Sequence, residues 1–251
     1  MTEPGSTGEQ PKSFINANEA IYFSLQSDRV KRNCQLLQSI ARKECVAYLG
    51  CSSTAADLYL KQGVGTLHAY DVSRTHGDNL RQDASINTAG RKYLETFWDV
   101  DGGDCPVPDN TYDVIIAGEV VEHLFDTDKF ARELYRTLKP EGTLIISTPN
   151  LASWYNRLRL LRGKAPRSFP GTSATIKKDE YIDTAHIRVN ILSEWTYFLK
   201  KHGFEVTGVY GGSYFHALQG GLKTRLIKAI DRLASKNPKI AVYLTMVAHK
   251  S

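Results

Sequence analysis

The sequence predicts an α/β fold of the Rossmann-like, doubly wound type, with a mostly parallel seven-stranded sheet and helices on both faces. Short apolar segments alternate with segments whose apolar residues recur at helical spacing. Glycines or acidic residues follow several of the apolar segments. The clearest unit spans Asp99 to Asn150, where apolar runs at 114–117 and 144–146 flank a helical pattern. A strand, a crossover helix and a parallel strand are therefore expected there.

The other elements follow from the same periodicities. In chain order, helices are expected at 18–42, 54–62 and 193–202, and strands at 45–49, 66–70, 93–98, 114–117, 144–146, 204–210 and 240–248. The first five of these strands are expected to be parallel. Ligands bind beyond the carboxyl ends of parallel strands, so the residues that follow these strands are the candidate site residues.

Length and composition indicate one domain. A chain of 251 residues with 41% hydrophobic content can bury one sizeable core, so 18–251 is expected to form a single domain after a flexible, polar tail at 1–17. Neither a signal peptide nor a run of about 20 apolar residues is apparent, which favours a cytoplasmic protein. The four cysteines include no close CxxC pair, which argues against a disulfide framework. The net charge of +5 permits an anionic partner.

Asp71 is a candidate cofactor residue. It ends the second expected strand, 21 positions after Gly50, where doubly wound folds place a carboxylate that binds a ribose diol. The turn at 50–55, GCSSTA, lacks the GxGxxG pattern that holds a pyrophosphate. An adenosine cofactor without phosphates therefore fits better than a dinucleotide. The alternative is a surface aspartate that caps a turn.

The order of these motifs resembles that of class I S-adenosylmethionine-dependent methyltransferases over roughly residues 45–204. The motifs are the turn at Gly50, Asp71 after its strand, Asp99-Val100 before Pro106-Val107-Pro108-Asp109-Asn110, Tyr112-Asp113, the segment from Glu119 to Leu124, and Leu138-Lys139-Pro140-Glu141-Gly142. The resemblance implies S-adenosylmethionine as the cofactor. It also assigns positions: Gly50, Cys51 and Ser52 near the methionine part, Asp71 with Val72 at the ribose hydroxyls, Asp99 and Val100 at the adenine edge, and Gly118 beneath the sulfonium.

The first motif departs from the pattern of that family. Members usually carry an acid two residues before the first glycine and further glycines at alternate positions, where this chain has Tyr48, Ser52 and Thr54. Glycine lets a backbone approach a ligand closely and accepts torsions that a β-branched threonine resists. A non-catalytic scaffold with a methyltransferase fold is therefore one alternative.

Glu119, Glu122 and His123 are the candidate catalytic residues. If a helix begins at Glu119, the other two follow by three and four positions and share its face. The spacing is similar to that of metal-assisted O-methyltransferases, namely the ubiquinone-pathway enzymes and the small-RNA 2′-O-methyltransferases, in which a later histidine completes the site. His186 is the matching residue, and Mg²⁺ or Mn²⁺ would suit such ligands.

Two other interpretations of this segment remain open. Without a metal, His123 would act as the general base that removes the proton of the acceptor, with Glu119 or Glu122 orienting its ring. Alternatively, the carboxylates are favoured only by the dipole at a helix N-terminus and have no role in chemistry.

The segment 151–190 is expected to form a cap on the acceptor side of the site. It has eight basic residues against three acidic ones, Asp179, Glu180 and Asp183. An anionic acceptor would suit this surplus, and Trp154 or Tyr155 could stack on a sugar or aromatic ring. A solvated helix, with Trp154, Leu158 and Leu161 packed inward, explains the pattern equally well.

The segment 221–238 is predicted to form a basic amphipathic helix. Its leucines and isoleucines fall on one face, with lysines and arginines around them. Packing of the apolar face on the sheet is the favoured interpretation. The alternative is peripheral contact with an anionic membrane surface.

The sequence thus predicts an S-adenosylmethionine-dependent methyltransferase that acts on an oxygen of a small metabolite, sugar or lipid-linked precursor. The alternatives are a metal-dependent RNA 2′-O-methyltransferase and the non-catalytic scaffold. Salt-sensitive binding to short RNA would favour the first alternative, because phosphate contacts release counterions.

Overall fold

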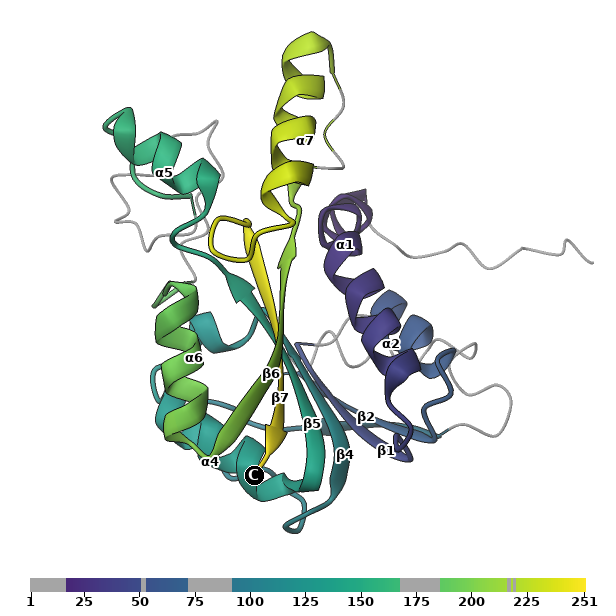
Figure 1. Cartoon of the computed structure of the whole chain (residues 1–251). Coiled ribbons are helices and arrows are strands. Elements are labelled where there is room, and N and C mark those ends of the chain that lie inside the picture. Colours follow the sequence, from purple (N-terminus) through teal and green to yellow (C-terminus); the bar gives the residue numbers. More distant parts are fainter. Residues whose placement is uncertain (1–16, 51–52, 72–91, 168–185, 216–217, 219) are drawn as a thin grey trace, which may run out of the picture.

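The computed structural model describes residues 17–50, 53–71, 92–167, 186–215, 218 and 220–251. These residues form a seven-stranded sheet in the order β3-β2-β1-β4-β5-β7-β6 (Figure 1). The five strands from β3 to β5 are parallel, and β7 is antiparallel to both β5 and β6. The strands are β1 (Cys45–Leu49), β2 (Thr66–Asp71), β3 (Lys92–Phe97), β4 (Tyr112–Gly118), β5 (Leu138–Pro149), β6 (Phe204–Gly212) and β7 (Tyr243–Lys250).

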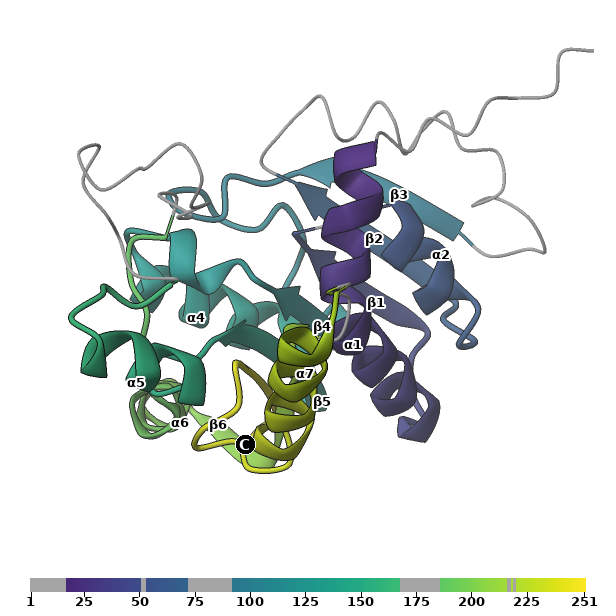
Figure 2. The same cartoon turned by 90° about the horizontal axis from the view of Figure 1, so that it is seen from above.

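Helices cover both faces of the sheet (Figures 1 and 2). The helical elements are α1 (Ala17–Ser39), α2 (Ser53–Leu60), the 3₁₀ turn η2 (Val121–His123), α4 (Thr127–Thr137), α5 (Trp154–Leu161), α6 (Leu192–Lys201) and α7 (Leu222–Ala234). None of the helices in the described ranges is long and apolar enough to cross a membrane. The α/β class, the parallel core and the two covered faces agree with the sequence prediction.

Strand β4 lies at the centre of two hydrophobic cores. All seven of its residues are buried, as expected for an interior strand of a parallel sheet. Successive side chains of a strand point to opposite faces. Val114 and Ile116 accordingly pack with Leu37 of α1, whereas Ile115 packs with Trp195 of α6.

Two expected strand boundaries differ from the structure. Residues 140–142 do not form a turn before β5. They lie within it, where Glu141 has a φ of 61° and the register to β4 shifts between Tyr112 and Val114. The last strand begins at Tyr243 and not at 240, because Ile240 and Ala241 both donate to the carbonyl of Asn237 and form a turn.

The expectation that the helix at 221–238 packs its apolar face on the sheet is wrong. Helix α7 follows β6 and extends beyond the edge of the sheet (Figure 1). Leu222, Leu226 and Leu233 are 84%, 62% and 67% exposed. The helical pattern correctly located the amphipathic face, but that face points away from the body of the protein.

Asp231 holds α7 in place. Its carboxylate is fully buried and accepts hydrogen bonds from the Ser213 hydroxyl, the backbone N–H groups of Tyr214 and Phe215, and Nε1 of Trp154 at 3.0 Å. Because these donors come from the segment after β6 and from α5, one side chain joins three parts of the chain. Buried carboxylates need such partners to offset the loss of water.

We expect Asp231→Ala to lower the free energy of unfolding by about 3 kcal/mol, since it leaves buried donors without an acceptor. The matched control is Asp104→Ala, because the Asp104 side chain is 80% exposed and only pairs with Lys129 at 3.3 Å. It should cost less than about 1 kcal/mol. Urea unfolding of the three proteins measures both values. Equal stability of the two variants would show that Asp231 does not hold α7.

Candidate functional site

Four of the expected cofactor residues lie along one edge of the sheet. Gly50, Asp71 and Gly118 end or follow β1, β2 and β4, and Asp99 follows β3 by two positions. These four strands are neighbours in the sheet, and all end at the same edge. Cys51, Ser52 and Val72 lie outside the described residues. The edge therefore brings together residues that are as far apart as 68 positions in the sequence.

The ends of β1 and β4 approach each other closely. Gly50 has a φ of 70°, and a Cβ at this position would lie 2.9 Å from the carbonyl oxygen of Gly118. A larger residue would be strained by its torsion and would also collide with this oxygen. The chain thus retains one glycine where the geometry requires it, although the turn has fewer glycines than the family pattern.

The side chain of Arg29 on α1 reaches Gly118, next to Gly50. The sequence analysis did not predict a role for Arg29. Its side chain is buried, and a Cβ at Gly118 would lie 1.8 Å from its Nη1 atom. The absence of a side chain at Gly118 therefore makes room for the guanidinium. No sequence signal marked this contact, because a single arginine within the 23-residue helix α1 has no periodic pattern of its own.

Tyr48 stands where relatives carry an acid, and it is a core residue. It is buried, and its ring packs edge-on against that of Tyr59 of α2, with centroids 5.0 Å apart. The Tyr59 hydroxyl in turn accepts a hydrogen bond from Nδ2 of Asn33 on α1. Tyr48 therefore packs β1 against α2, and Tyr59 joins α2 to α1.

Asp99 is exposed and Val100 is buried, in the loop that follows β3. The Asp99 carboxylate accepts a hydrogen bond from the backbone of Asp101 at 3.2 Å. Asp101 accepts hydrogen bonds from the backbone N–H groups of Phe125 and Asp126, at 2.6 and 2.9 Å. The loops after β3 and β4 are thereby joined, which fixes Asp99 relative to β4.

The expectation that Glu119 begins a helix is wrong. Glu119 has a φ of 59°, its N–H donates to the carbonyl of Ser147 at 3.0 Å, and the 3₁₀ turn begins only at Val121. Glu122 and His123 are therefore not on a shared helical face with it. Non-glycine residues adopt such a torsion mainly at turns and functional sites.

The structure does bring His186 to Glu122 and His123. Ligand atoms of these three residues lie within 4.8 Å of one another. The two histidine rings have centroids 4.7 Å apart, and Nε2 of His186 is 4.0 Å from Oε1 of Glu122. A carboxylate and two imidazoles at this separation would suit a divalent transition metal such as Mn²⁺, and Glu119, the fourth expected ligand, is not part of this group.

Backbone contacts hold His186 against the 3₁₀ turn. The N–H groups of Ile187 and Arg188 donate to the carbonyl of Glu122 at 2.8 and 3.2 Å. The Arg188 guanidinium donates to the carbonyls of Leu124 and Phe125, at 3.1 and 2.7 Å. These contacts fix the chain after His186 relative to the 3₁₀ turn that carries Glu122 and His123.

Glu122 has an unusual environment for a carboxyl group. It is fully buried, and the Thr148 hydroxyl is the side-chain group that lies against it. Burial raises its pKa well above the usual value, and the charge of Glu119 raises it further, whereas that of Arg29 opposes the shift. The carboxyl thus favours its protonated form unless a cation lies beside it.

The residues after β5 have a structural role. The Asn150 amide donates to the carbonyls of Pro238 and Ala241, at 3.2 and 2.9 Å, and its oxygen accepts from the N–H of Ala152. Asn156 donates to the carbonyl of Asn150 at 3.2 Å. These contacts fix the start of α5 against the turn before β7.

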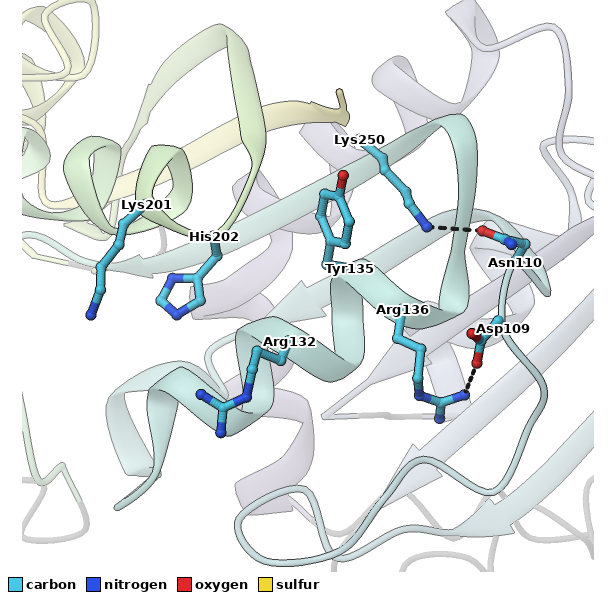
Figure 3. A pocket seen from close by; sticks show the side chains of 8 residues that line it. All are labelled: Asp109, Asn110, Arg132, Tyr135, Arg136, Lys201, His202 and Lys250. Carbon is cyan, nitrogen blue, oxygen red and sulfur yellow. Dashed lines mark hydrogen bonds and ion pairs between the residues drawn. The ribbon is translucent and has the colours of Figure 1, made fainter.

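A pocket of about 560 Å³ lies at the opposite edge of the sheet. Figure 3 shows that it lies between α4, the end of α6 and the last residues of β7. Its lining residues are Asp109, Asn110, Arg132, Tyr135, Arg136, Lys201, His202 and Lys250. Most of its polar groups bind one another: Arg136 pairs with Asp109 at 2.8 Å, and Lys250 donates to Asn110. None of the expected site residues lines this pocket.

We expect Glu122→Gln to change how stability depends on pH in chelator-treated protein. Because the folded pKa lies above the unfolded one, wild-type stability falls as pH rises from about 4.5 toward the folded pKa. Glutamine removes this loss, so the variant should gain stability relative to wild type by about 1.4 kcal/mol per pH unit in that interval. Urea unfolding from pH 5 to 8 measures this, with exposed Glu205→Gln as control. Parallel profiles for wild type and Glu122→Gln would contradict the assignment.

Part of this chain is similar to known methyltransferases. Residues 47–146 match a family model described as a methyltransferase domain. A probable S-adenosylmethionine-dependent methyltransferase of Mycobacterium tuberculosis is 28% identical over 152 residues, which cover 58% of this chain and 55% of that protein. A similar protein of Mycolicibacterium smegmatis is 31% identical over 108 residues, 43% of this chain and 34% of that protein. The chain thus spans about a third to a half of the length of these relatives.

Solved structures show the same fold. The putative methyltransferase of Haloferax volcanii, solved in complex with the Trm112 methyltransferase activator, superposes with a TM-score of 0.62 at 16% identity, over 92% of this chain and 97% of that one. The matched residues 47–146 contain β2, β3 and β4 and most of β1 and β5, and Gly50, Asp71, Asp99 and Gly118 all lie within them. Over residues 47–146 the chain therefore matches the methyltransferase-domain family, and the relatives that it resembles there are probable S-adenosylmethionine-dependent methyltransferases.

Proposed function

We propose that the protein transfers a methyl group from S-adenosylmethionine to an oxygen of a small metabolite, sugar or lipid-linked precursor. One observation carries the proposal: Gly50, Asp71, Asp99 and Gly118 occur at the ends of four neighbouring strands. The edge thereby offers a carboxylate for a ribose, a backbone approach free of side chains, and a cation. We propose that 18–251 acts as one domain, with 151–190 as the acceptor-side cap.

We assign the cofactor contacts from this arrangement. Asp71 would bind the ribose hydroxyls, Asp99 and Val100 would border the adenine, and Gly50 with its neighbours Cys51 and Ser52 would face the methionine part. Arg29, whose guanidinium lies against Gly118, would pair with the methionine carboxylate. S-adenosylmethionine supplies an electrophilic methyl group when bound. The chain itself has to orient that group and remove a proton from the acceptor.

His123 is the group that we assign to this proton. It is half-buried next to Glu122 and His186 at the carboxyl edge, and neutral imidazole accepts a proton near neutral pH. His123 would accept the proton of the acceptor at a ring nitrogen as the acceptor oxygen takes the methyl group, and the bond from that methyl group to the sulfonium would break to release the demethylated cofactor. Because Glu119 and Glu122 both lie nearby, either carboxylate would stabilise the imidazolium that forms.

We expect Arg29→Met to weaken binding of S-adenosylmethionine by 10-fold or more, because it removes a charge-assisted hydrogen bond worth about 1.5 to 3 kcal/mol. Binding of 5′-methylthioadenosine, which lacks the amino-acid part, should be nearly unchanged. Asp71→Ala should weaken both ligands. Titration calorimetry measures all these affinities. Equal weakening of both ligands by Arg29→Met would indicate a general loss of structure and would contradict the assignment to the carboxylate.

A metal-assisted form of this reaction is favoured by the grouping of Glu122, His123 and His186. Their ligand atoms lie within 4.8 Å of one another, and the Glu122 carboxyl is fully buried. Mg²⁺ or Mn²⁺ held here, with Glu119 close by, would lower the pKa of an acceptor hydroxyl. The cation would also stabilise the buried Glu122 in its charged form.

We expect chelator-treated protein to bind one Mn²⁺, and His123→Ala or His186→Ala to weaken this binding by 10-fold or more. His202→Ala is the matched control, because His202 pairs with Asp128 at 2.9 Å at the opposite edge of the sheet. Electron paramagnetic resonance of free Mn²⁺ gives the bound fraction. Binding that is equally strong in all three variants would rule out this metal site and leave His123 as a metal-free base.

A further inference from the structure

Helix α7 presents an apolar stripe away from the protein. Leu222, Leu226, Ile230 and Leu233 follow one another at spacings that place them on a single face of a helix. All four are exposed. The opposite face contains Asp231 and Ala234, which are buried. The side that attaches α7 to the protein is therefore the polar Asp231 side, and the apolar side is left outward.

Basic residues border this stripe. Lys223, Arg225, Lys228 and Arg232 lie in α7, whose only acidic residue is the buried Asp231. By helical spacing, Arg225 and Arg232 flank the stripe on one side and Lys223 flanks it on the other. A helix with a narrow apolar face between cationic residues has the amphipathic pattern of segments that lie in the headgroup region of a bilayer.

A second helix offers the same chemistry at the same end of the molecule. Helix α5 ends in Leu160 and Leu161, which are 57% and 85% exposed, and it carries Arg157 and Arg159 without any acidic residue. Because β5 and β6 run in the same direction, α5 and α7 both start from the carboxyl edge of the sheet. Trp154 donates to Asp231 across the two helices, and both extend beyond this edge in Figure 1.

We propose that these exposed leucines, Ile230 and basic residues of α5 and α7, here called the α5–α7 surface, dock the protein on an anionic phospholipid bilayer. The leucines would enter the acyl boundary, and the arginines and lysines would contact lipid phosphates. The tether at Asp231 keeps both helices at the edge that carries Gly118 and His123. Docking would therefore turn the candidate site toward the membrane.

The charge pattern selects a bilayer over other partners. A second copy of the chain would bring two cationic surfaces together in a symmetric contact, which like charges oppose. A nucleic acid would pair with the basic residues and leave the leucines in contact with water. An anionic bilayer satisfies both chemistries at once, because it offers phosphates at its surface and hydrocarbon beneath them.

Flotation of the full chain with vesicles tests the proposal. Vesicles of phosphatidylcholine with 30% phosphatidylglycerol, roughly the charge of an anionic membrane, are compared with pure phosphatidylcholine vesicles. We expect the protein to float with the anionic vesicles and not with the neutral ones. Docking needs neither S-adenosylmethionine nor turnover, so this outcome is independent of the proposed reaction.

Two pairs of variants divide the surface into its components. Leu222→Gln/Leu226→Gln should lower the vesicle partition coefficient at least 10-fold, and Arg225→Gln/Arg232→Gln should lower it about 25-fold, or fivefold for each charge. The matched controls are Leu94→Gln/Tyr197→Gln, which alters exposed apolar residues of β3 and α6, and Arg132→Gln/Lys200→Gln, which alters exposed cations of α4 and α6. The controls should bind as wild type does.

Because all the altered residues of α7 are exposed, these variants should unfold at the same temperature as wild type, which a thermal melt verifies. Absence of flotation with anionic vesicles, or equal losses in the α7 variants and the controls, would overturn the proposal. A dimer in solution that Leu222→Gln/Leu226→Gln converts to a monomer would also overturn it, by showing that a second copy covers the stripe.

Discussion

The close approach of β1 and β4 at their carboxyl ends is the constraint on which the site depends. Gly50 and Gly118 meet there without side chains, and the Arg29 guanidinium occupies the space over Gly118. A Cβ at either position would displace a neighbouring strand end or the arginine. The same approach sets where β2 and β3 end relative to β4, because the four strands are hydrogen-bonded side by side. The approach of Gly50 to Gly118 therefore also determines where Asp71 and Asp99 lie, although neither aspartate takes part in it.

Residues in the second half of the chain hold two segments, the one with His186 and helix α7, next to this edge of the sheet. Arg188 and the backbone of Ile187 bind the 3₁₀ turn, which places His186 beside His123. Asp231 binds α5 and the segment after β6, which holds α7 at the outside. Arg188 and Asp231 are both charged side chains that form hydrogen bonds with backbone groups, and both residues lie outside the matched residues 47–146. We infer that the common domain binds the cofactor and that these later segments adapt it to an acceptor.

Much of this arrangement could be predicted from the sequence, for identifiable reasons. The apolar runs at 45–49 and 114–117 gave β1 and β4 to within two residues, because interior parallel strands are buried on both faces. Asp71 followed from its distance to Gly50. His186 was found only because a motif resembled that of metal-assisted enzymes, since nothing in its local sequence marks a contact 63 residues away. Arg29 was missed because one arginine in a long helix carries no periodic signal.

Two predictions were wrong because the spacing of apolar residues indicates the conformation of a segment but not which other part of the protein it packs against. The pattern at 221–238 gave an amphipathic helix correctly, but whether its apolar face meets the sheet depends on Asp231, one residue on the other face. The pattern from Glu119 gave a helix too early, because the positive φ of Glu119 is imposed by its bond to Ser147 on β5. Both errors concern tertiary contacts, and both fall on residues to which we assign a role beyond the core.

We propose that the carboxyl edge of β1 to β4 binds S-adenosylmethionine, although its first turn has few glycines. Calorimetric titration of S-adenosylmethionine and of its demethylated product into the full chain tests it most directly. The account predicts micromolar binding of both at one site, since we assign to Gly50, Asp71 and Arg29 the cofactor contacts that the missing glycines cannot make. No heat of binding up to millimolar concentrations of either ligand would contradict it and would favour a scaffold that has kept the fold without the cofactor.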